Sequence, residues 1–224
     1  MDFTIKNKAI SIVSKRNSGK SILVKYLIKD AIREQHFNKI FVISSTNCVN
    51  HFYNDFIEPT CIFDSYSEDW VEKLIILMSN KNDKKKTNEL YHVLLVLDDM
   101  CSDVSMHNSP SIRKLFSRGR HACISIIVIA QMLHHISPLM RCNSDYILSG
   151  QLNSANIQLM SDEFRCPLIS KNEFVNLVAD SKTLVSGGSL YLNTFNLINV
   201  YNLCFDTYYN LTITNLDNNT TNNL

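Results

Sequence analysis

Gly19, Lys20 and Ser21 stand between an apolar, β-branched run and a long helical pattern. A glycine at such a junction lets the backbone turn closely around a ligand, and the start of the helix directs free N–H groups at an anion. The lysine supplies positive charge for phosphate oxygens, and the serine hydroxyl is an oxygen ligand for Mg²⁺. This combination is typical of a phosphate-binding loop and predicts a nucleoside triphosphate site.

The predicted loop covers nine residues and would bind ATP with Mg²⁺. They are Ser14, Lys15, Arg16, Asn17, Ser18, Gly19, Lys20, Ser21 and Ile22. Lys20 would neutralise the β- and γ-phosphates, and Ser21 would be a metal ligand. Ser14 stands where the usual pattern begins with glycine, which would stiffen the loop and slow hydrolysis. The alternative interpretation is a chance Gly-Lys-Ser tripeptide at a helix start.

Two carboxylates follow the most apolar run of the chain, residues 92–97. Asp98 would hold Mg²⁺ through its water shell, and Asp99 would orient or deprotonate the attacking water. The simpler alternative is an Asp-rich turn after a strand. The phosphate-binding loop upstream favours the catalytic interpretation, because two such motifs occur in the order that an ATPase needs.

A third polar position ends another buried run, residues 123–130, which leads into Gln131. An amide at the phosphate-binding edge of a sheet can sense the γ-phosphate or position water. The simpler interpretation is that Gln131 only caps the strand. Arg118 and Arg120 precede this run, and their simpler interpretation is a solvated basic turn.

Taken together, these segments resemble the DNA-packaging ATPases of nucleocytoplasmic large DNA viruses, including the poxvirus type. That family belongs to the FtsK–HerA superfamily of P-loop motors. The resemblance rests on the strand that ends in Gln131 and on residues 15–21, 97–99 and 119–121, with weaker likenesses at residues 44–46 and 138–146. It extends from about residue 5 to residue 164.

The resemblance implies a RecA-like sheet in which the strand ending in Gln131 lies between the other two motif strands. It implies a homo-oligomeric ring, a pentamer or hexamer, that threads double-stranded DNA into a preformed capsid and meets capsid or portal proteins. In such rings an arginine reaches the ATP of the neighbouring subunit. Arg120 and the adjacent Arg118 are the candidates for this catalytic role, and Arg141 is a third.

The elements that position these residues alternate between strands and helices. Apolar runs without polar alternation predict strands buried on both faces, hence an α/β fold with a mostly parallel sheet sandwiched by helices. The strands are expected at residues 9–13, 39–44, 60–63, 92–97, 123–130 and 145–148, and the helices at 21–35, 69–78 and 112–118.

Three segments divide the chain. Residues 1–182 are expected to form the P-loop ATPase domain, and residues 183–214 a strand-rich extension of it with a hairpin at Gly187-Gly188. Residues 215–224 are almost all Asn, Thr and Asp, and are expected to be disordered.

Charge limits how the chain could bind DNA. With 22 basic and 21 acidic residues its net charge is +1, far below that of a protein that grips duplex DNA unaided. DNA contact would therefore come from a local patch or from several subunits together. The dense basic run at residues 81–86 is the candidate, and a solvated linker loop is the alternative.

Cysteine usage and hydropathy indicate an intracellular protein. The seven cysteines are scattered without a C-x-x-C pair, which favours a reducing compartment over a zinc or redox site. The N-terminus does not resemble a signal peptide, and no apolar stretch reaches the roughly 18 residues that span a membrane. With the viral resemblance, the expected location is the virion or the host cytoplasm.

Two other functions compete with the motor. A small P-loop nucleoside or nucleotide kinase also fits about 200 residues, but it has less use for consecutive aspartates and a strand that ends in Gln. A nucleotide-binding assembly module would use ATP to order subunit contacts with little turnover, and Ser14 in place of glycine favours it.

Overall fold

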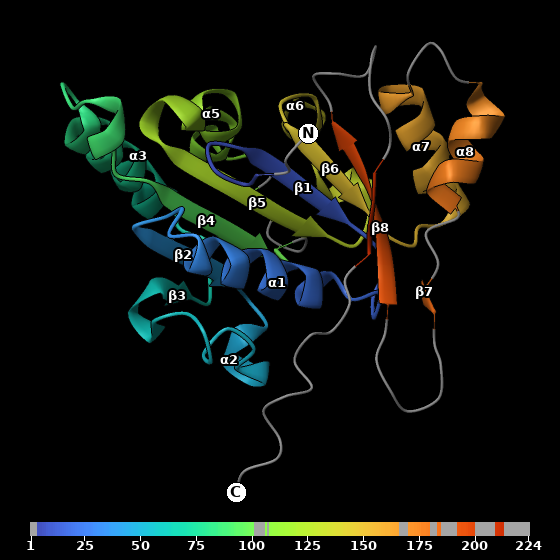
Figure 1. Ribbon diagram of the computed structural model, residues 1–224, viewed down its shortest axis with the longest axis horizontal. Coiled ribbons are helices and arrows are strands. Elements are labelled where there is room, and N and C mark those ends of the chain that lie inside the picture. Colours follow the sequence, from blue (N-terminus) through green and yellow to red (C-terminus); the bar gives the residue numbers. More distant parts are fainter. Residues whose placement is uncertain are drawn as a thin grey trace, which may run out of the picture.

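A computed structural model of the chain describes residues 4–100, 106, 108–165, 170–179, 183–184, 192–199 and 209–212. At its centre six parallel strands lie in the order β3-β2-β4-β5-β1-β6 (Figure 1). They are β3 (Ile62–Phe63), β2 (Lys39–Ser44), β4 (Val93–Asp98), β5 (Ile124–Ala130), β1 (Ala9–Val13) and β6 (Tyr146–Ser149). The predicted α/β sandwich is confirmed, and β5 lies between β1 and β4 as the resemblance implied.

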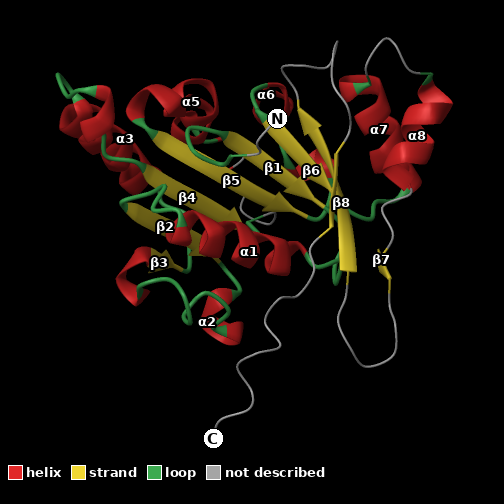
Figure 2. Ribbon diagram, in the orientation of Figure 1, coloured by secondary structure: helices red, strands yellow, loops and turns green. Residues whose placement is uncertain are grey.

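The sheet is buried on both faces because its central strands are almost entirely apolar, with Ser11 and Ser125 as buried exceptions. Side chains alternate between two cores: Leu94 and Val96 belong to one, while Val93, Leu95 and Leu97 belong to the other. Helix α1 (Lys20–Arg33) covers the first core. Helices α3 (Glu68–Asn82) and α5 (Pro110–Arg118) cover the second, on the opposite side of the sheet (Figure 2).

Local capping explains where several helices begin. Ser67 precedes α3 and accepts a hydrogen bond from the Trp70 N–H at 3.3 Å. Ser109 does the same for Ile112 at 2.9 Å, and Pro110 follows it as the first residue of α5. These side chains satisfy N–H groups that a helix start leaves without partners.

Some elements differ from the sequence-based expectation. The strand expected at residues 60–63 is reduced to β3, since Pro59–Cys61 forms a 3₁₀ turn. Within the described residues four helices were not predicted: α2 (Asn47–Asn50), α6 (Pro138–Cys142), α7 (Ser154–Phe164) and α8 (Lys171–Ala179). In α7 the buried face includes Asn156 and Ser161, so polar residues interrupt the apolar pattern that identifies a helix.

Strands from the C-terminal part extend the sheet with antiparallel pairing. Strand β8 (Leu192–Asn199) pairs with β6, with β7 (Thr183–Leu184) and with β9 (Tyr209–Thr212). Gly187-Gly188, expected to form a hairpin turn, and residues 215–224, expected to be disordered, lie outside the described residues. None of the helices within the described ranges is long and apolar enough to cross a membrane.

Candidate active site

The loop between β1 and α1 has the backbone geometry of an anion cradle. Gly19 caps the start of α1 with a φ of 86°, and Asn17 also has a positive φ of 59°. Glycine adopts this left-handed conformation without steric cost. The first turn of α1 thereby directs its N–H groups and its dipole toward the space in front of the loop.

Ser14 is buried at the base of this loop and lacks a positive φ, so its backbone does not require glycine. Its N–H donates to the Ala130 carbonyl at 3.2 Å, and its hydroxyl donates to the Gln151 carbonyl at 3.2 Å. The Lys15 N–H donates to the same Gln151 oxygen at 2.9 Å. These bonds give a physical source for the expected stiffening of the loop; slower hydrolysis stays a prediction.

A cavity of about 300 Å³ lies in front of the loop, at the carboxyl ends of the parallel strands. This volume is at the lower end of the range for small-molecule sites, roughly 300–1,000 Å³. Its lining residues come from the loop, from the segment after β2 and from the ends of β4 and β5. They are Arg16, Asn17, Ser18, Gly19, Lys20, Ser21, Ile22, Thr46, Asn50, Phe52, Asp98, Asp99, Ile129 and Gln131. Ser14 and Lys15, both predicted in the loop, are not among them.

Lys20 is folded back onto the loop, where its Nζ donates to the carbonyls of Ser14 at 2.5 Å and Lys15 at 2.7 Å. Carbonyl oxygens are weak partners for an ammonium group compared with phosphate oxygens. Lys20 is therefore positioned to exchange these contacts for a phosphate that enters the cavity.

Asp98 is the last residue of β4 and is only 8% exposed. Tyr53 donates a hydrogen bond from its hydroxyl to Asp98 Oδ2 at 2.7 Å. Burial raises the pKa of Asp98, and the charge of Asp99 adds to this, whereas the Tyr53 hydrogen bond and the charge of Lys20 lower it. Burial and the Asp98 charge raise the pKa of Tyr53 well above its usual value.

Asp99 is held by two contacts in an unusual backbone conformation, with a φ of 54°. Gln131 Nε2 donates to Asp99 Oδ1 at 3.0 Å, and Ser45 Oγ donates to the Asp99 carbonyl at 3.3 Å. The parallel register of β4 and β5, in which Asp98 faces Ile129, brings the Gln131 amide beside this carboxylate. The structure thus joins the acidic pair and Gln131 in one site.

A magnesium site of the P-loop kind fits these residues. The described residues contain no cluster of three or more His, Cys, Asp or Glu side chains that could hold a metal alone. A nucleotide-bound Mg²⁺ needs few protein ligands, because phosphates and water supply the others. Ser21 and Asp98 both line the cavity. The buried Ser18 hydroxyl has no hydrogen-bond partner among the described residues, which suits a donor that a phosphate would satisfy.

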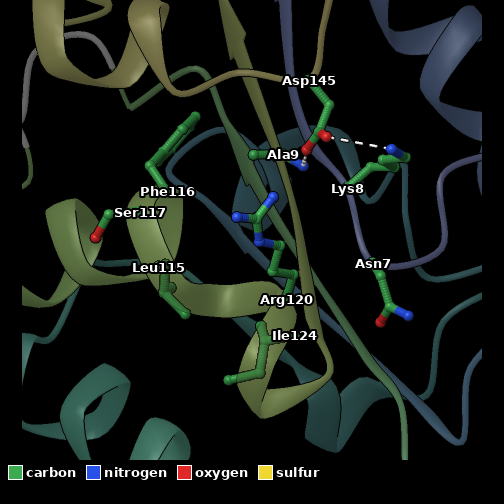
Figure 3. A pocket seen from close by; sticks show the side chains of 9 residues that line it. All are labelled: Asn7, Lys8, Ala9, Leu115, Phe116, Ser117, Arg120, Ile124 and Asp145. Atoms are coloured by element: carbon green, nitrogen blue, oxygen red, sulfur yellow. Dashed lines mark hydrogen bonds and ion pairs between the residues drawn. The ribbon is translucent and has the colours of Figure 1, made fainter. Parts of the chain in front are cut away.

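Arg118 and Arg120 do not reach this cavity. Arg118 ends α5, and Arg120 lies in the 3₁₀ turn Gly119–Ala122 that precedes β5, at the amino end of the sheet. Figure 3 shows Arg120 in a small cavity beside Lys8 and Asp145, which form an ion pair at 3.2 Å. Both arginines are exposed and lie at the opposite end of the sheet from the cavity.

Gly119 fixes the turn that carries Arg120. A Cβ added at Gly119 would lie 3.0 Å from the Ile124 carbonyl oxygen, so a side chain there would require the turn to move from β5 by a few tenths of an ångström.

Arg141, the third candidate for action on a neighbour, has a different role. Its guanidinium is buried, pairs with the Glu163 carboxylate and donates to the carbonyls of Leu133 and Ile136. Because its donors are engaged by α7 and by the turn after Gln131, its interactions lie within its own subunit.

Sequence reasoning missed the wall of the cavity that follows β2. Thr46, Asn50 and Phe52 line it, and Tyr53 lies behind it. The likeness at residues 44–46 pointed to the start of this wall. Nothing in the spacing connects Tyr53 with Asp98, 45 positions away.

Comparison with known proteins identifies the family. The model of the family described as Poxvirus A32 protein matches residues 3–208. The chain belongs to this family. The resemblance to viral packaging ATPases is therefore confirmed, and the Poxvirus A32 match includes the cavity and the whole parallel sheet.

Relatives of this Poxvirus A32 family member occur in iridescent viruses and in Frog virus 3. Protein 075L of Invertebrate iridescent virus 6 is 29% identical over 160 residues, which cover 70% of this chain and 60% of that protein. Protein 015R of Frog virus 3 is 24% identical over 154 residues, 69% of this chain and 47% of that protein. Both are uncharacterised, and the chain spans about half to three fifths of their length.

A solved structure has the same fold. The genome packaging NTPase B204 from Sulfolobus turreted icosahedral virus 2, in complex with AMP, superposes with a TM-score of 0.61. The match covers 91% of this chain and 96% of B204, with 17% sequence identity.

Proposed function

We propose that this protein is an ATP-hydrolysing motor that moves double-stranded DNA into a preformed viral capsid. One observation carries the proposal: the Lys20 loop faces Asp98, Asp99 and Gln131 across a single cavity of about 300 Å³. A phosphate-binding loop opposite an acidic strand end is the arrangement that phosphoryl transfer to water needs.

Each polar group has a role in this reaction. With the triphosphate over the start of α1, Lys20 leaves its loop carbonyls and neutralises the β- and γ-phosphates. Mg²⁺, held by Ser21 and by Asp98 through water, would offset the charge of the phosphate oxygens. Asp99 accepts a proton from the attacking water, and Gln131, already bonded to Asp99, orients that water or contacts the γ-phosphate.

Membership of the Poxvirus A32 family supports the packaging role, as does the fold shared with a genome packaging NTPase. We propose further that the subunits form a homo-oligomeric ring, a pentamer or hexamer, that assembles with capsid or portal proteins. The motor would act in the virion or in the host cytoplasm, where the genome is packaged. The free thiols of Cys48, Cys61, Cys123 and Cys142 suit a reducing compartment.

ATP hydrolysis, measured with and without duplex DNA, tests the proposal. We expect free phosphate as the product and faster release when DNA is present. Lys20→Ala is the control, since it removes the charge that binds phosphate. Transfer of labelled phosphate to a nucleoside would instead identify a kinase. ATP binding without turnover would identify an assembly module.

The DNA contact is proposed at residues 84–86, three exposed lysines in the loop between α3 and β4. Changing all three to glutamine is expected to weaken DNA binding and to flatten its salt dependence, by about 0.9 in the log–log slope for each phosphate that the loop no longer neutralises. DNA affinity measured across a salt series checks this. A variant with Lys29, Lys73 and Lys171 changed to glutamine removes the same charge elsewhere. Equal affinity in the two variants would exclude the loop.

A further inference from the structure

The segment after β2 contacts both aspartates of the candidate site, one at its backbone and one at its carboxylate. Ser45 donates to the Asp99 carbonyl at 3.3 Å, and Tyr53 donates to Asp98 Oδ2 at 2.7 Å. Between them, Thr46 and Phe52 line the cavity. The proposed reaction assigns no role to this segment, so these contacts need a separate explanation.

Tyr53 is the most firmly fixed side chain of this segment. It is 1% exposed, and its backbone N–H donates to Asn47 Oδ1 at 3.0 Å. Asn47 is itself buried and donates to Asn54 Oδ1 at 3.0 Å, which closes the loop on itself. The Tyr53 ring also packs against Phe52 and Phe56, with centroids 5.1 and 5.7 Å away. The hydroxyl therefore points at Asp98 from a rigid support.

Asp98 needs such a partner because a carboxylate at a strand end rotates easily about its last torsion, which has only a broad preference. A short hydrogen bond from a fixed donor to one oxygen sets the orientation of both oxygens. Since Asp98 lines the cavity, the bond to Oδ2 determines how the carboxylate faces the space beside Ser21.

We propose that Tyr53 is a positioning residue, which holds the Asp98 carboxylate in the orientation that binding of the Mg²⁺–nucleotide complex requires. The proposal rests on the proposed function, because it assumes that Asp98 meets a nucleotide-bound Mg²⁺. Tyr53 does not line the cavity and would touch neither the nucleotide nor the ion. It acts through Asp98 as a partner of a metal ligand.

Tyr53→Phe tests the proposal, because it removes the hydroxyl and keeps the ring packing. Binding of a fluorescent ATP analogue is measured in EDTA and across a Mg²⁺ titration, without turnover. We expect affinity in EDTA to match the parent protein. The Mg²⁺ concentration for half-maximal enhancement of binding is expected to rise about 10-fold or more, as for other partners of metal ligands.

Three further variants define the range. Asp98→Asn shows how much the Mg²⁺ requirement changes when the carboxylate is removed completely. Tyr66→Phe is the matched control, since the Tyr66 hydroxyl also bonds a carboxylate, Glu68, but outside the cavity. It is expected to bind like the parent. Asn47→Ala, which loosens the support of Tyr53 without touching Asp98, is expected to shift the Mg²⁺ requirement in the same direction and by less. If Tyr53→Phe does not fold, Asn47→Ala tests the proposal in its place.

The outcomes separate the two proposals. An unchanged Mg²⁺ requirement in Tyr53→Phe would overturn the role of Tyr53 and leave the ATPase proposal intact. Equal losses with and without Mg²⁺ would also overturn it, because they would indicate a general collapse of the cavity wall. Failure of the parent protein to bind the analogue at all would overturn both.

Discussion

Replacing Asp99 by asparagine is expected to lower ATP turnover by a factor of about 10² to 10⁴, the usual contribution of a general base. Asparagine keeps the shape of the side chain and an oxygen that can accept the Gln131 bond, but it cannot take a proton from water. Nucleotide affinity is expected to stay near that of the parent, because Lys20 and the start of α1 are unchanged. Phosphate release and equilibrium binding of an ATP analogue measure the two effects.

Asp55→Asn is the control for this experiment, since Asp55 is an exposed aspartate outside the cavity. Turnover in the Asp99 variant equal to that of the control would exclude Asp99 as the base. A joint loss of binding and turnover would mean that Asp99 supports the cavity instead of the chemistry.

Arg120→Ala is expected to lower turnover of the assembled ring by a factor of about 10³ to 10⁵, the range for an arginine that stabilises the charge of phosphoryl transfer. Arg120 is exposed at the amino end of β5, whereas the cavity lies at the carboxyl end of the same sheet. An effect of this size must therefore act on the ATP of another subunit. Arg118→Ala, made in parallel, shows which arginine of the pair carries the effect.

Mixing two inactive variants tests whether the arginine acts between subunits. In a mixed ring of Arg120→Ala and Asp99→Asn subunits, some interfaces combine an intact Asp99 with an intact Arg120 from the neighbour. We expect part of the turnover to return in the mixture and none in either variant alone. Absence of recovery in rings shown to contain both subunits would argue against action across the interface.

The sequence predicted those parts of the site whose chemistry is tied to a strand end. Residues 93–97 are apolar without interruption, which identified β4, and the polar residues that follow had to lie at its carboxyl edge. The same reasoning placed Gln131 after β5 and the Lys20 loop after β1. In a parallel sheet these ends meet at one edge, so the three motifs came together as expected.

Tertiary contacts set the parts that the sequence did not reveal. Tyr53 reaches Asp98 only because its loop folds back under the end of β4, and no periodicity encodes that path. Arg141 was a candidate for action on a neighbouring subunit, but its partner Glu163 comes from α7, a helix that the sequence did not reveal because its buried face is partly polar. The sequence placed Arg118 and Arg120 before β5. It could not show whether they act in their own subunit or on a neighbour, because that is decided by how the subunits assemble.

The buried pair of Arg141 and Glu163 has a mechanical consequence. The pair holds α6, α7 and the turn just after Gln131 together. Separating them would leave a buried charge without its partner, which is strongly unfavourable. The turn and the two helices therefore form one connected block that begins just after Gln131. In the proposed motor, a displacement of Gln131 is therefore expected to reach α7 through this pair.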